Sequence, residues 1–464
     1  MAGIFKAYDI RGIVGEGLTT QRSYLIGRAL AQEVFANNSS EKRPIVVSRD
    51  MRTHSPELSA ALIRGLSEGG CDVLDIGLAA TPMNYWANAH FNSGGSVQVT
   101  ASHNGPEYNG FKVSAANTIP LDFSTGLDKV EQSVLSAEKE ASPHMSTHAA
   151  GQVTQAENTL RDYLDWMNQF MAPQPSGGNQ RLKIGIDAAN GMGGFFLPEF
   201  FARHPQIEVV PLFWELDGTF PNHEADPLKE ENLRDVQALV LEHNCDFGVA
   251  YDGDADRCMF VDETGANISS DLTTALIATR MLEQTPGSPI LYDLRSSHIV
   301  PEWIEQHGGQ AVRGRVGHSF MKRLLREKQA RFGGELSGHY YFADCFNTDS
   351  GLMAMIQVIN IWMANQNSGT PLSQLVAPLR KYAATGEINF HVADVATTLK
   401  RLEAHYRAQN AQLDYLDGVT VELDHWWFNL RSSNTEPVLR LNLEAATATE
   451  RDAHLEEVKA LIES

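Results

Sequence analysis

The chain has 464 residues, of which 42% are hydrophobic, and its formal net charge is −21 at pH 7. This length suggests about three or four domains, and the negative charge argues against nucleic acid or an anionic membrane as a partner. No apolar run approaches the ~20 residues that span a bilayer, and four scattered cysteines form neither a disulfide framework nor a CxxC metal site, so we expect a cytoplasmic protein.

One unit recurs along the chain: an apolar strand, an amphipathic helix, another strand and a polar loop. It recurs from residue 182 to 257 and again from 271 to 342. Strands that alternate with helices are typical of α/β domains with largely parallel sheets. In the first region the pattern predicts strands over 44–50, 71–77 and 95–100 and helices over 55–70 and 81–91.

The tail has a different pattern, with one helix predicted over 395–408 among strands over 386–392, 418–423, 426–433 and 438–444. This pattern is typical of an α+β domain with an antiparallel sheet. Stretches rich in Pro, Ser and Gly at 140–152 and 171–180 mark the junction of the first two regions. The predicted fold class is α/β, with three similar α/β domains of mixed, largely parallel sheets and a C-terminal α+β domain. We place the domains at 1–150, 151–265, 266–378 and 379–464.

Four polar loops follow predicted strands. Open α/β sheets usually bind ligands beyond the carboxyl ends of their strands, so the four loops share one site if the domains close around a cleft. The loops are "TASHNGPEYNGFK" (100–112), "DGDADR" (252–257), "GELSGH" (334–339) and "RSSNTEP" (431–437).

Asp252, Asp254 and Asp256 alternate at the end of an apolar strand, so their carboxylates can converge on one point. Oxygen ligands of this kind suit a hard cation such as Mg²⁺ or Ca²⁺. A calcium EF-hand is the nearest alternative, but its sixth position needs glycine and here holds Arg257, and both flanks are predicted as strands. The loop could also be an ordinary solvated acidic turn. Three aspartates in register on an apolar strand argue against this alternative. The metal interpretation is preferred.

Ser102 lies in a loop with Gly105 and Gly110, whose backbone can approach a ligand closely. It can simply cap a turn or helix, or serve as a hydrolase nucleophile, although no G-x-S-x-G elbow surrounds it. A phosphorylated Ser102 would instead add charge and oxygen acceptors. One phosphate oxygen could complete a ligand shell begun by the three aspartates, and Arg257 could neutralise the charge of a transferring phosphoryl group.

Together with "FKAYDIRG" (5–12), these loops make five motifs in order that span the whole chain. In these motifs the sequence resembles the α-D-phosphohexomutases, and within them the bacterial phosphomannomutase/phosphoglucomutase branch. The resemblance implies four domains around a central cleft and a phosphoserine at Ser102. It also implies that Asp252, Asp254, Asp256 and that phosphate hold Mg²⁺.

The resemblance further implies a role for each residue that matches a family motif. The catalytic set next to the transferring phosphate is Ser102, His103, Arg11, Lys112, Arg257 and His339. The substrate-binding set is Tyr8, Arg295, His318, Glu335 and Ser337, with a clamp for the non-reacting phosphate at Arg431, Ser433, Asn434 and Thr435. Taken alone, His318 and His339 would more often be structural histidines. Two positions depart from the family: Gly105 stands where proline is usual, and Ser350 separates Asp349 from the glycine that usually follows it.

The implied reaction is a reversible phosphoryl transfer. Phospho-Ser102 gives its phosphoryl group to O6 of a hexose 1-phosphate, and the 1,6-bisphosphate turns about half a turn before Ser102 reclaims a phosphoryl group from O1. The expected partners are hexose phosphates, and the expected cofactors are Mg²⁺ and a hexose 1,6-bisphosphate. Three alternatives stay open: a phosphoglucosamine mutase, a metal-dependent phosphatase and a non-catalytic sugar-phosphate sensor. The preferred sugar and the oligomeric state are also open, and a monomer is compatible with the sequence.

Overall fold

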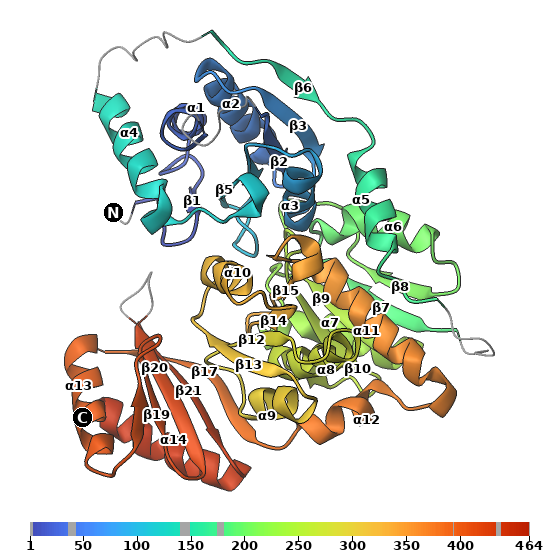
Figure 1. Ribbon diagram of the computed structural model, residues 1–464, viewed down its shortest axis with the longest axis vertical. Coiled ribbons are helices and arrows are strands. Elements are labelled where there is room, and N and C mark those ends of the chain that lie inside the picture. Colours follow the sequence, from blue (N-terminus) through green and yellow to red (C-terminus); the bar gives the residue numbers. More distant parts are fainter. Residues whose placement is uncertain are drawn as a thin grey trace.

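The computed structural model describes residues 3–35, 43–139, 149–173, 181–392, 394–432 and 438–463. These residues form four units, each built on its own sheet and coloured in chain order from blue to red in Figure 1. Within the described residues, no helix is long and apolar enough to span a membrane. The predicted clamp residues Ser433, Asn434 and Thr435 lie outside the described residues.

The first unit has a six-stranded sheet in the order β1-β5-β4-β2-β3-β6. Its centre is parallel, and β5 runs antiparallel to both of its neighbours. The strands are β1 (Ile10–Ile13), β2 (Ile45–Arg49), β3 (Val73–Leu78), β4 (Gly95–Val99), β5 (Tyr108–Ala115) and β6 (Val153–Gln155), so this sheet extends beyond residue 150. The helices are α1 (Thr20–Ala29), which continues as a π-helix (Leu30–Phe35), α2 (Ser55–Glu68), α3 (Thr81–His90) and α4 (Leu127–Lys139).

Helices α1 and α2 pack together through two glycines that face each other. A Cβ atom on Gly27 would lie 2.3 Å from the carbonyl oxygen of Leu62, and one on Gly65 would lie 2.1 Å from that of Tyr24. Only a residue without a side chain allows the two backbones to approach this closely. The Thr19 hydroxyl accepts a hydrogen bond from the Arg22 backbone and so caps the start of α1.

The second and third units repeat this architecture. The second sheet has the order β11-β10-β9-β7-β8 and the third the order β13-β12-β14-β15-β16. The second unit contains β7 (Lys183–Asp187), β8 (Glu208–Leu212), β9 (Phe247–Tyr251), β10 (Cys258–Asp262), β11 (Asn267–Ile268), α5 (Thr159–Asn168), α6 (Gly193–Ala202) and α7 (Glu230–His243). The third contains β12 (Pro289–Asp293), β13 (Gln310–Gly314), β14 (Phe332–Gly334), β15 (Tyr340–Phe342), β16 (Thr348–Asp349), α8 (Ser270–Gln284), α9 (Ile299–Gln306), α10 (His318–Glu327), α11 (Gly351–Asn365) and α12 (Leu372–Val376).

The first three units share one strand order, and this order puts one predicted site loop at the same position in each unit. The orders β3-β2-β4-β5, β8-β7-β9-β10 and β13-β12-β14-β15 correspond, and in each the last two strands are consecutive and antiparallel. The loops that join these last two strands contain Ser102, the three aspartates and "GELSGH" respectively. Three of the predicted site loops therefore occupy the same position in three copies of one fold.

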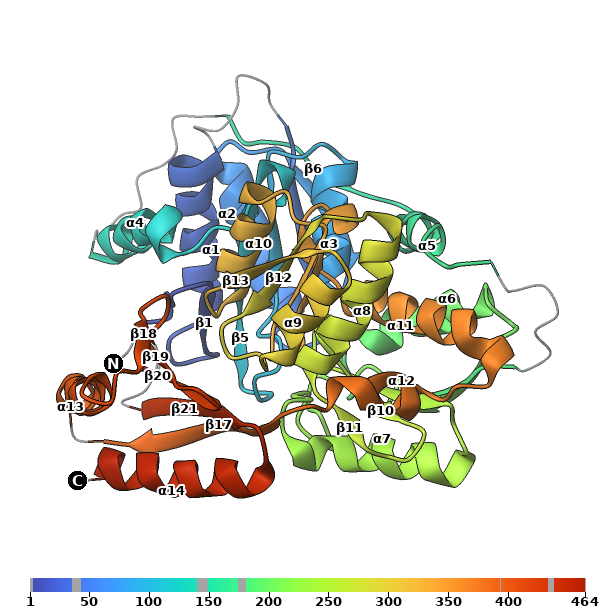
Figure 2. The ribbon, with the colours of Figure 1, turned by 60° about the horizontal axis from the view of Figure 1, so that its bottom comes forward.

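The fourth unit is an antiparallel sheet in the order β17-β21-β20-β19-β18. Helices α13 and α14 pack against the sheet, and Figure 2 shows α14 beneath β17 and β21. The elements are β17 (Ala383–His391), β18 (Gln412–Asp414), β19 (Val419–Glu422), β20 (Trp426–Ser432), β21 (Val438–Ala445), α13 (Val395–Arg407) and α14 (Ala448–Glu463). This confirms the predicted fold class of three α/β domains followed by an α+β domain, whereas the exact domain boundaries stay predictions.

The buried side chains form one large core and several smaller ones. The large core joins the second and third units and includes Trp86 and Met83 of α3 in the first unit. The first unit has a second core of its own on the other side of its sheet, and the fourth unit has a separate core. Short 3₁₀ helices cover Ala116–Thr118, Phe123–Thr125, Ala343–Cys345, Gln366–Ser368 and Ala377–Leu379.

Candidate active site

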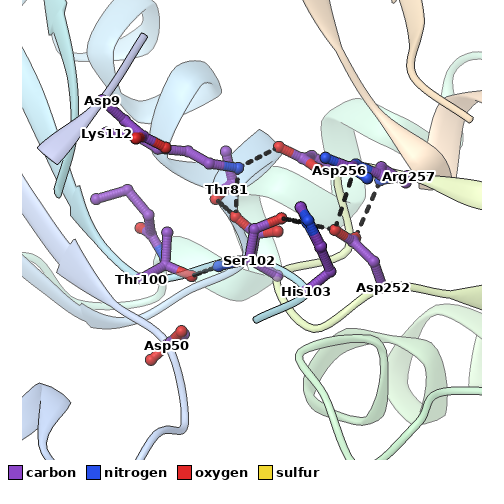
Figure 3. Close-up of polar contacts among 12 residues, drawn as sticks. Asp9, Asp50, Thr81, Thr100, Ser102, His103, Lys112, Asp252, Asp256 and Arg257 are labelled. Atoms are coloured by element: carbon purple, nitrogen blue, oxygen red, sulfur yellow. Dashed lines mark hydrogen bonds and ion pairs between the residues drawn. The ribbon is translucent and has the colours of Figure 1, made fainter. Parts of the chain in front are cut away.

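Ser102 faces the tri-aspartate loop across the junction of the first two units (Figure 3). Its hydroxyl donates to Asp252 Oδ2 at 2.8 Å, and its backbone N–H donates to Thr100 Oγ1 at 2.9 Å. The residue is 1% exposed and has a φ of 53°, a left-handed conformation that non-glycine residues rarely adopt. Ser102 is thus held in a strained geometry that directs its hydroxyl at a carboxylate of the neighbouring unit.

The aspartate loop joins β9 to β10, and its residues 252–256 are buried. The side chains of Asp252, Asp254 and Asp256 are 0–1% exposed, and one oxygen of each lies within 4.8 Å of the others. A Cβ atom on Gly253 would lie 2.4 Å from the carbonyl oxygen of Ser102. Glycine therefore allows the loop that carries Ser102 and the aspartate loop to touch.

Lys112 on β5 supplies the cation that balances this cluster. Its Nζ lies 2.7 Å from Asp254 Oδ2 and 2.5 Å from Asp256 Oδ2. Burial lowers the pKa of Lys112, but the surrounding carboxylates outweigh this effect, so its pKa is raised. Burial also raises the pKa of Asp254, and its contact with Lys112 reverses the direction and lowers it. The pKa of Asp252 is raised well above its usual value by burial and by its two acidic neighbours, which makes Asp252 the least compensated carboxyl group.

The donor set fits a hard divalent cation. Asp254 Oδ1 and Asp256 Oδ1 are buried and have no hydrogen-bond partner among the described residues. Together with Asp252 they offer the oxygen ligands that Mg²⁺ prefers. The Ser102 hydroxyl lies beside Asp252, so a phosphate on Ser102 would add a further oxygen to the same cluster.

A second group of possible ligands, Asp256, His339 and Asp349, lies beside the first. The negative charge of Asp349 is already balanced, because Lys322 Nζ lies 2.7 Å from its Oδ1 and His339 Nδ1 lies 2.7 Å from its Oδ2. Burial raises the pKa of Asp349, but Lys322 and His339 outweigh it and the pKa is lowered well below the usual value. Lys322 also donates to the Tyr85 hydroxyl at 2.8 Å. We therefore interpret these contacts as fixing the orientation of the His339 ring rather than as a second metal site.

His339 also contacts the aspartate loop directly. Arg257 Nε donates to His339 Nε2 at 2.9 Å, and a backbone bridge pairs the two residues. This contact leaves the imidazole proton on Nδ1, where it faces Asp349. Arg257 Nε also lies 3.8 Å from Asp252 Oδ2. The three equivalent loops are thus linked in sequence from Ser102 through Asp252 and Arg257 to His339.

His103 and His318 are both buried imidazoles with lowered pKa values. His103 Nδ1 lies 3.2 Å from Ser102 Oγ, and burial, followed by the positive charge of Arg257, holds its pKa well below 6.5. For His318, burial and then Lys322 lower the pKa in the same way. Both rings are therefore neutral near pH 7.

Several of the predicted substrate-binding residues line the neighbouring surfaces. The Tyr8 hydroxyl donates to the carbonyl oxygen of Val316 at 3.4 Å, and the Tyr8 ring packs edge-on against His318. Glu335 Oε1 accepts the Gly317 N–H at 2.8 Å, and its other oxygen accepts the Tyr341 hydroxyl. The Arg11 guanidinium donates hydrogen bonds to the side chains of Asn104 and Asp9. Ser337 is partly buried in the loop between β14 and β15.

The predicted phosphate clamp contains a carboxylate that the sequence did not indicate. Glu387 on β17 lies 2.5 Å from Arg431, 3.4 Å from Arg295 and 3.1 Å from Arg440. Burial raises the pKa of Glu387, but these three guanidinium groups outweigh it and lower the pKa. Arg295 and Arg431, predicted separately, are thus joined across the third and fourth units through one acidic side chain. The roles of the individual site residues stay predictions.

Each of the four units matches a described domain of one protein family. Phosphoglucomutase/phosphomannomutase alpha/beta/alpha domains I, II and III match residues 2–141, 161–265 and 269–382, and the C-terminal domain of the same family matches residues 387–461. The chain belongs to the phosphoglucomutase/phosphomannomutase family. It is therefore an enzyme, an intramolecular phosphotransferase.

Relatives resemble the chain over nearly its whole length. A phosphohexose mutase of Xanthomonas campestris pv. campestris is 38% identical over 98% of this chain and 97% of its own. A phosphomannomutase of Escherichia coli is 36% identical over 99% and 98%. A solved phosphoglucomutase/phosphomannomutase family protein from Burkholderia thailandensis is 31% identical, superimposes with a TM-score of 0.88, and is matched over 99% of this chain and 96% of its own.

Proposed function

We propose that this enzyme interconverts hexose 1-phosphate and hexose 6-phosphate, of mannose, glucose or both, through a phosphorylated Ser102. The observation that carries the proposal is the Ser102 hydroxyl, buried 2.8 Å from Asp252 at the edge of a cluster of three carboxylates. The relatives named phosphomannomutase and phosphohexose mutase support the same class of substrate. Mg²⁺ and a hexose 1,6-bisphosphate are the cofactors that we propose.

The proposed cycle has two transfers. Phospho-Ser102 gives its phosphoryl group to O6 of a hexose 1-phosphate, which produces the 1,6-bisphosphate. After this intermediate has turned by about half a turn, Ser102 takes the phosphoryl group at O1 and releases hexose 6-phosphate. When Asp252, Asp254 and Asp256 hold Mg²⁺, the ion supplies Lewis-acid polarisation of the phosphoryl oxygens.

The side chains around Ser102 support these transfers. The Arg257 guanidinium lies beside Asp252 and His339, where it can stabilise charge on the transferring group. His339 is oriented by Asp349 and can take the proton of the attacking sugar hydroxyl at Nε2 once substrate displaces the Arg257 contact. His103 is neutral and close to the Ser102 oxygen. Burial of the cluster excludes water and so protects the phosphoserine from hydrolysis.

The far end of the substrate needs a separate anion site. Arg295 and Arg431 meet at Glu387, and with Ser433, Asn434 and Thr435 they form the clamp that we propose for the non-reacting phosphate. Guanidinium groups suit a phosphate because they donate paired hydrogen bonds. Such a clamp can bind either phosphate of the 1,6-bisphosphate, so the same site can accept the intermediate before and after its half-turn.

Turnover with three sugar phosphates tests the proposal. Mannose 1-phosphate, glucose 1-phosphate and glucosamine 1-phosphate should be compared with and without the matching 1,6-bisphosphate, and peptide mass mapping should find a phosphate on Ser102. Ser102→Ala should abolish turnover. Ser114→Ala, at a buried serine of β5 that is not among the predicted site residues, should retain it. Phosphate on another residue, or full turnover by Ser102→Ala, would exclude the phosphoserine mechanism. Preference for glucosamine 1-phosphate would favour the amino-sugar mutase.

A further inference from the structure

The loop that carries Ser102 turns four backbone carbonyl oxygens toward a single side chain, that of Arg52. Arg52 Nη1 donates to the carbonyl oxygens of Gly105 at 2.6 Å and Tyr108 at 3.0 Å. Its Nη2 donates to those of Ser102 at 2.8 Å and Asn104 at 2.5 Å. Carbonyl groups that are shielded from water need hydrogen-bond donors, and here one guanidinium binds all four, although the Gly105 carbonyl oxygen also accepts the Tyr108 N–H at 3.2 Å.

Arg52 is itself fixed on two sides. Its side chain is fully buried, and its Nε lies 3.3 Å from Asp50 Oδ2 in the first unit. On the other side its guanidinium lies 5.0 Å from the centre of the Phe220 ring, which belongs to the second unit. A Cβ atom on Gly218 would lie 2.6 Å from the Arg52 Cα atom. Arg52 therefore joins the phosphoserine loop to the junction between the two units.

The loop needs such a hold because its backbone is strained. Ser102 has a φ of 53°, and a non-glycine residue keeps a left-handed conformation only where its surroundings enforce it. The four hydrogen bonds from Arg52 bracket both Ser102 and Gly105.

We infer that Arg52 is the positioning residue of the phosphoserine loop. By binding four carbonyl oxygens, its guanidinium holds Ser102 in the conformation that directs the hydroxyl at Asp252. A lysine at this position keeps the positive charge but has only three donors on one nitrogen, which cannot span four carbonyl groups in a fixed plane. The planar arrangement of the Arg52 guanidinium donors, rather than the positive charge, is therefore the property that the loop requires. The inference deepens the proposed function, because its kinetic consequence is measured as phosphoryl transfer.

The test compares Arg52→Lys with wild type in two independent measurements. Steady-state and single-turnover kinetics should show kcat lowered at least tenfold, and by about 100-fold if the nucleophile moves by about 1 Å, with KM for hexose 1-phosphate changed less than twofold. Hydrogen exchange followed by mass spectrometry should show faster exchange across residues 101–108 and unchanged exchange in the other sheets. The second measurement needs no turnover, so it tests Arg52 even if the proposed reaction is wrong.

Arg326 provides a matched control. It too is a largely buried arginine that donates to backbone carbonyl oxygens, including those of Thr118 at 3.0 Å and Phe346 at 2.8 Å, and so joins the first and third units. The two loops that contain Thr118 and Phe346 hold none of the predicted site residues. Arg326→Lys should lower the unfolding midpoint while kcat and the exchange of residues 101–108 stay at wild-type values.

Phe220→Leu covers the case in which Arg52→Lys does not fold. It removes the aromatic ring that packs against the guanidinium, so the guanidinium is held less firmly against the four carbonyl groups, and kcat should fall several-fold at constant KM. The inference is overturned if Arg52→Lys, or Phe220→Leu in its place, leaves kcat and loop exchange unchanged. It is also overturned if kcat falls only in proportion to the folded fraction, as a purely structural role predicts.

Discussion

Replacing Lys112 with methionine should destabilise the enzyme strongly in the absence of metal. Lys112 is the only cation within 3 Å of Asp254 and Asp256 among the described residues, with separations of 2.7 and 2.5 Å. At an effective dielectric constant of about 20, each contact contributes about 6 kcal/mol of gross attraction. Desolvation of the buried ammonium removes several kcal/mol of this. The removal of one partner of a buried ion pair is accordingly expected to cost about 3–5 kcal/mol.

The effect should depend on Mg²⁺ in a specific way. A loss of about 3–5 kcal/mol corresponds to a drop of about 6–20 °C in the melting temperature of a 150–250-residue cooperative unit. Lys112→Met leaves three buried carboxylates with one cation fewer, so the variant should bind Mg²⁺ more tightly than wild type. Binding at 100 times the Kd adds about 2.7 kcal/mol of stability, and the Mg²⁺-induced rise in melting temperature should be larger in the variant.

Thermal unfolding in EDTA and in a Mg²⁺ titration measures both effects. Lys381→Met is the matched control, because Lys381 forms an ion pair of 2.6 Å with Glu302 while about half exposed, and such surface pairs contribute only about 0–1 kcal/mol. The reasoning is refuted if Lys112→Met melts within 2 °C of wild type in EDTA. An equal Mg²⁺-induced shift in both proteins would likewise show that the lysine and the metal do not share these carboxylates.

Two further predictions concern other carboxylates. Asp252→Asn should raise the melting temperature in EDTA, because burial and acidic neighbours raise the pKa of this group, whereas Asp254→Asn should lower it by removing the charge that the buried lysine balances. Both should lose the Mg²⁺-induced shift in the same unfolding assay, and equal signs in EDTA would contradict the assignment. Glu387→Gln should raise KM several-fold, because Arg295 and Arg431 lose the carboxylate that joins them. Steady-state kinetics that match wild type would remove Glu387 from the clamp.

The sequence predicted the alternating elements and the site loops because both depend on local patterns. Apolar runs at 44–50 and 95–100 became β2 and β4, since a continuous apolar run bounded by turn residues is typical of a buried strand. The polar loops were visible because they interrupt such runs abruptly. Short edge strands escaped: β1 and β6 have four and three residues, too few to show a period.

The residues that escaped prediction have partners that are distant in sequence. Arg52 donates to carbonyl groups about 50 residues away, and backbone carbonyls are present at every position, so nothing in the sequence marks them. Lys322 meets Tyr85 of another unit, and Glu387 meets Arg295 of another unit. An isolated charged residue in a sequence is more often a solvated one, and only the packing of the units shows these three to be buried or partly buried at the site.

The hydrophobic cores divide the enzyme into two parts. The first three units share one core that includes Trp86, and the Lys322–Tyr85 contact between the first and third units is fully buried, so these units form one body. The fourth unit has its own core and contacts the third through Arg295 with Glu387, through the stacked rings of His298 and Trp427, and through the pair of His298 with Glu422, whose side chains are 40% and 29% exposed. Exposed pairs of this kind are weak. We therefore expect the site to open and close by a rotation of the fourth unit about the start of β17, which would separate Arg295 of the third unit from Glu387 of the fourth.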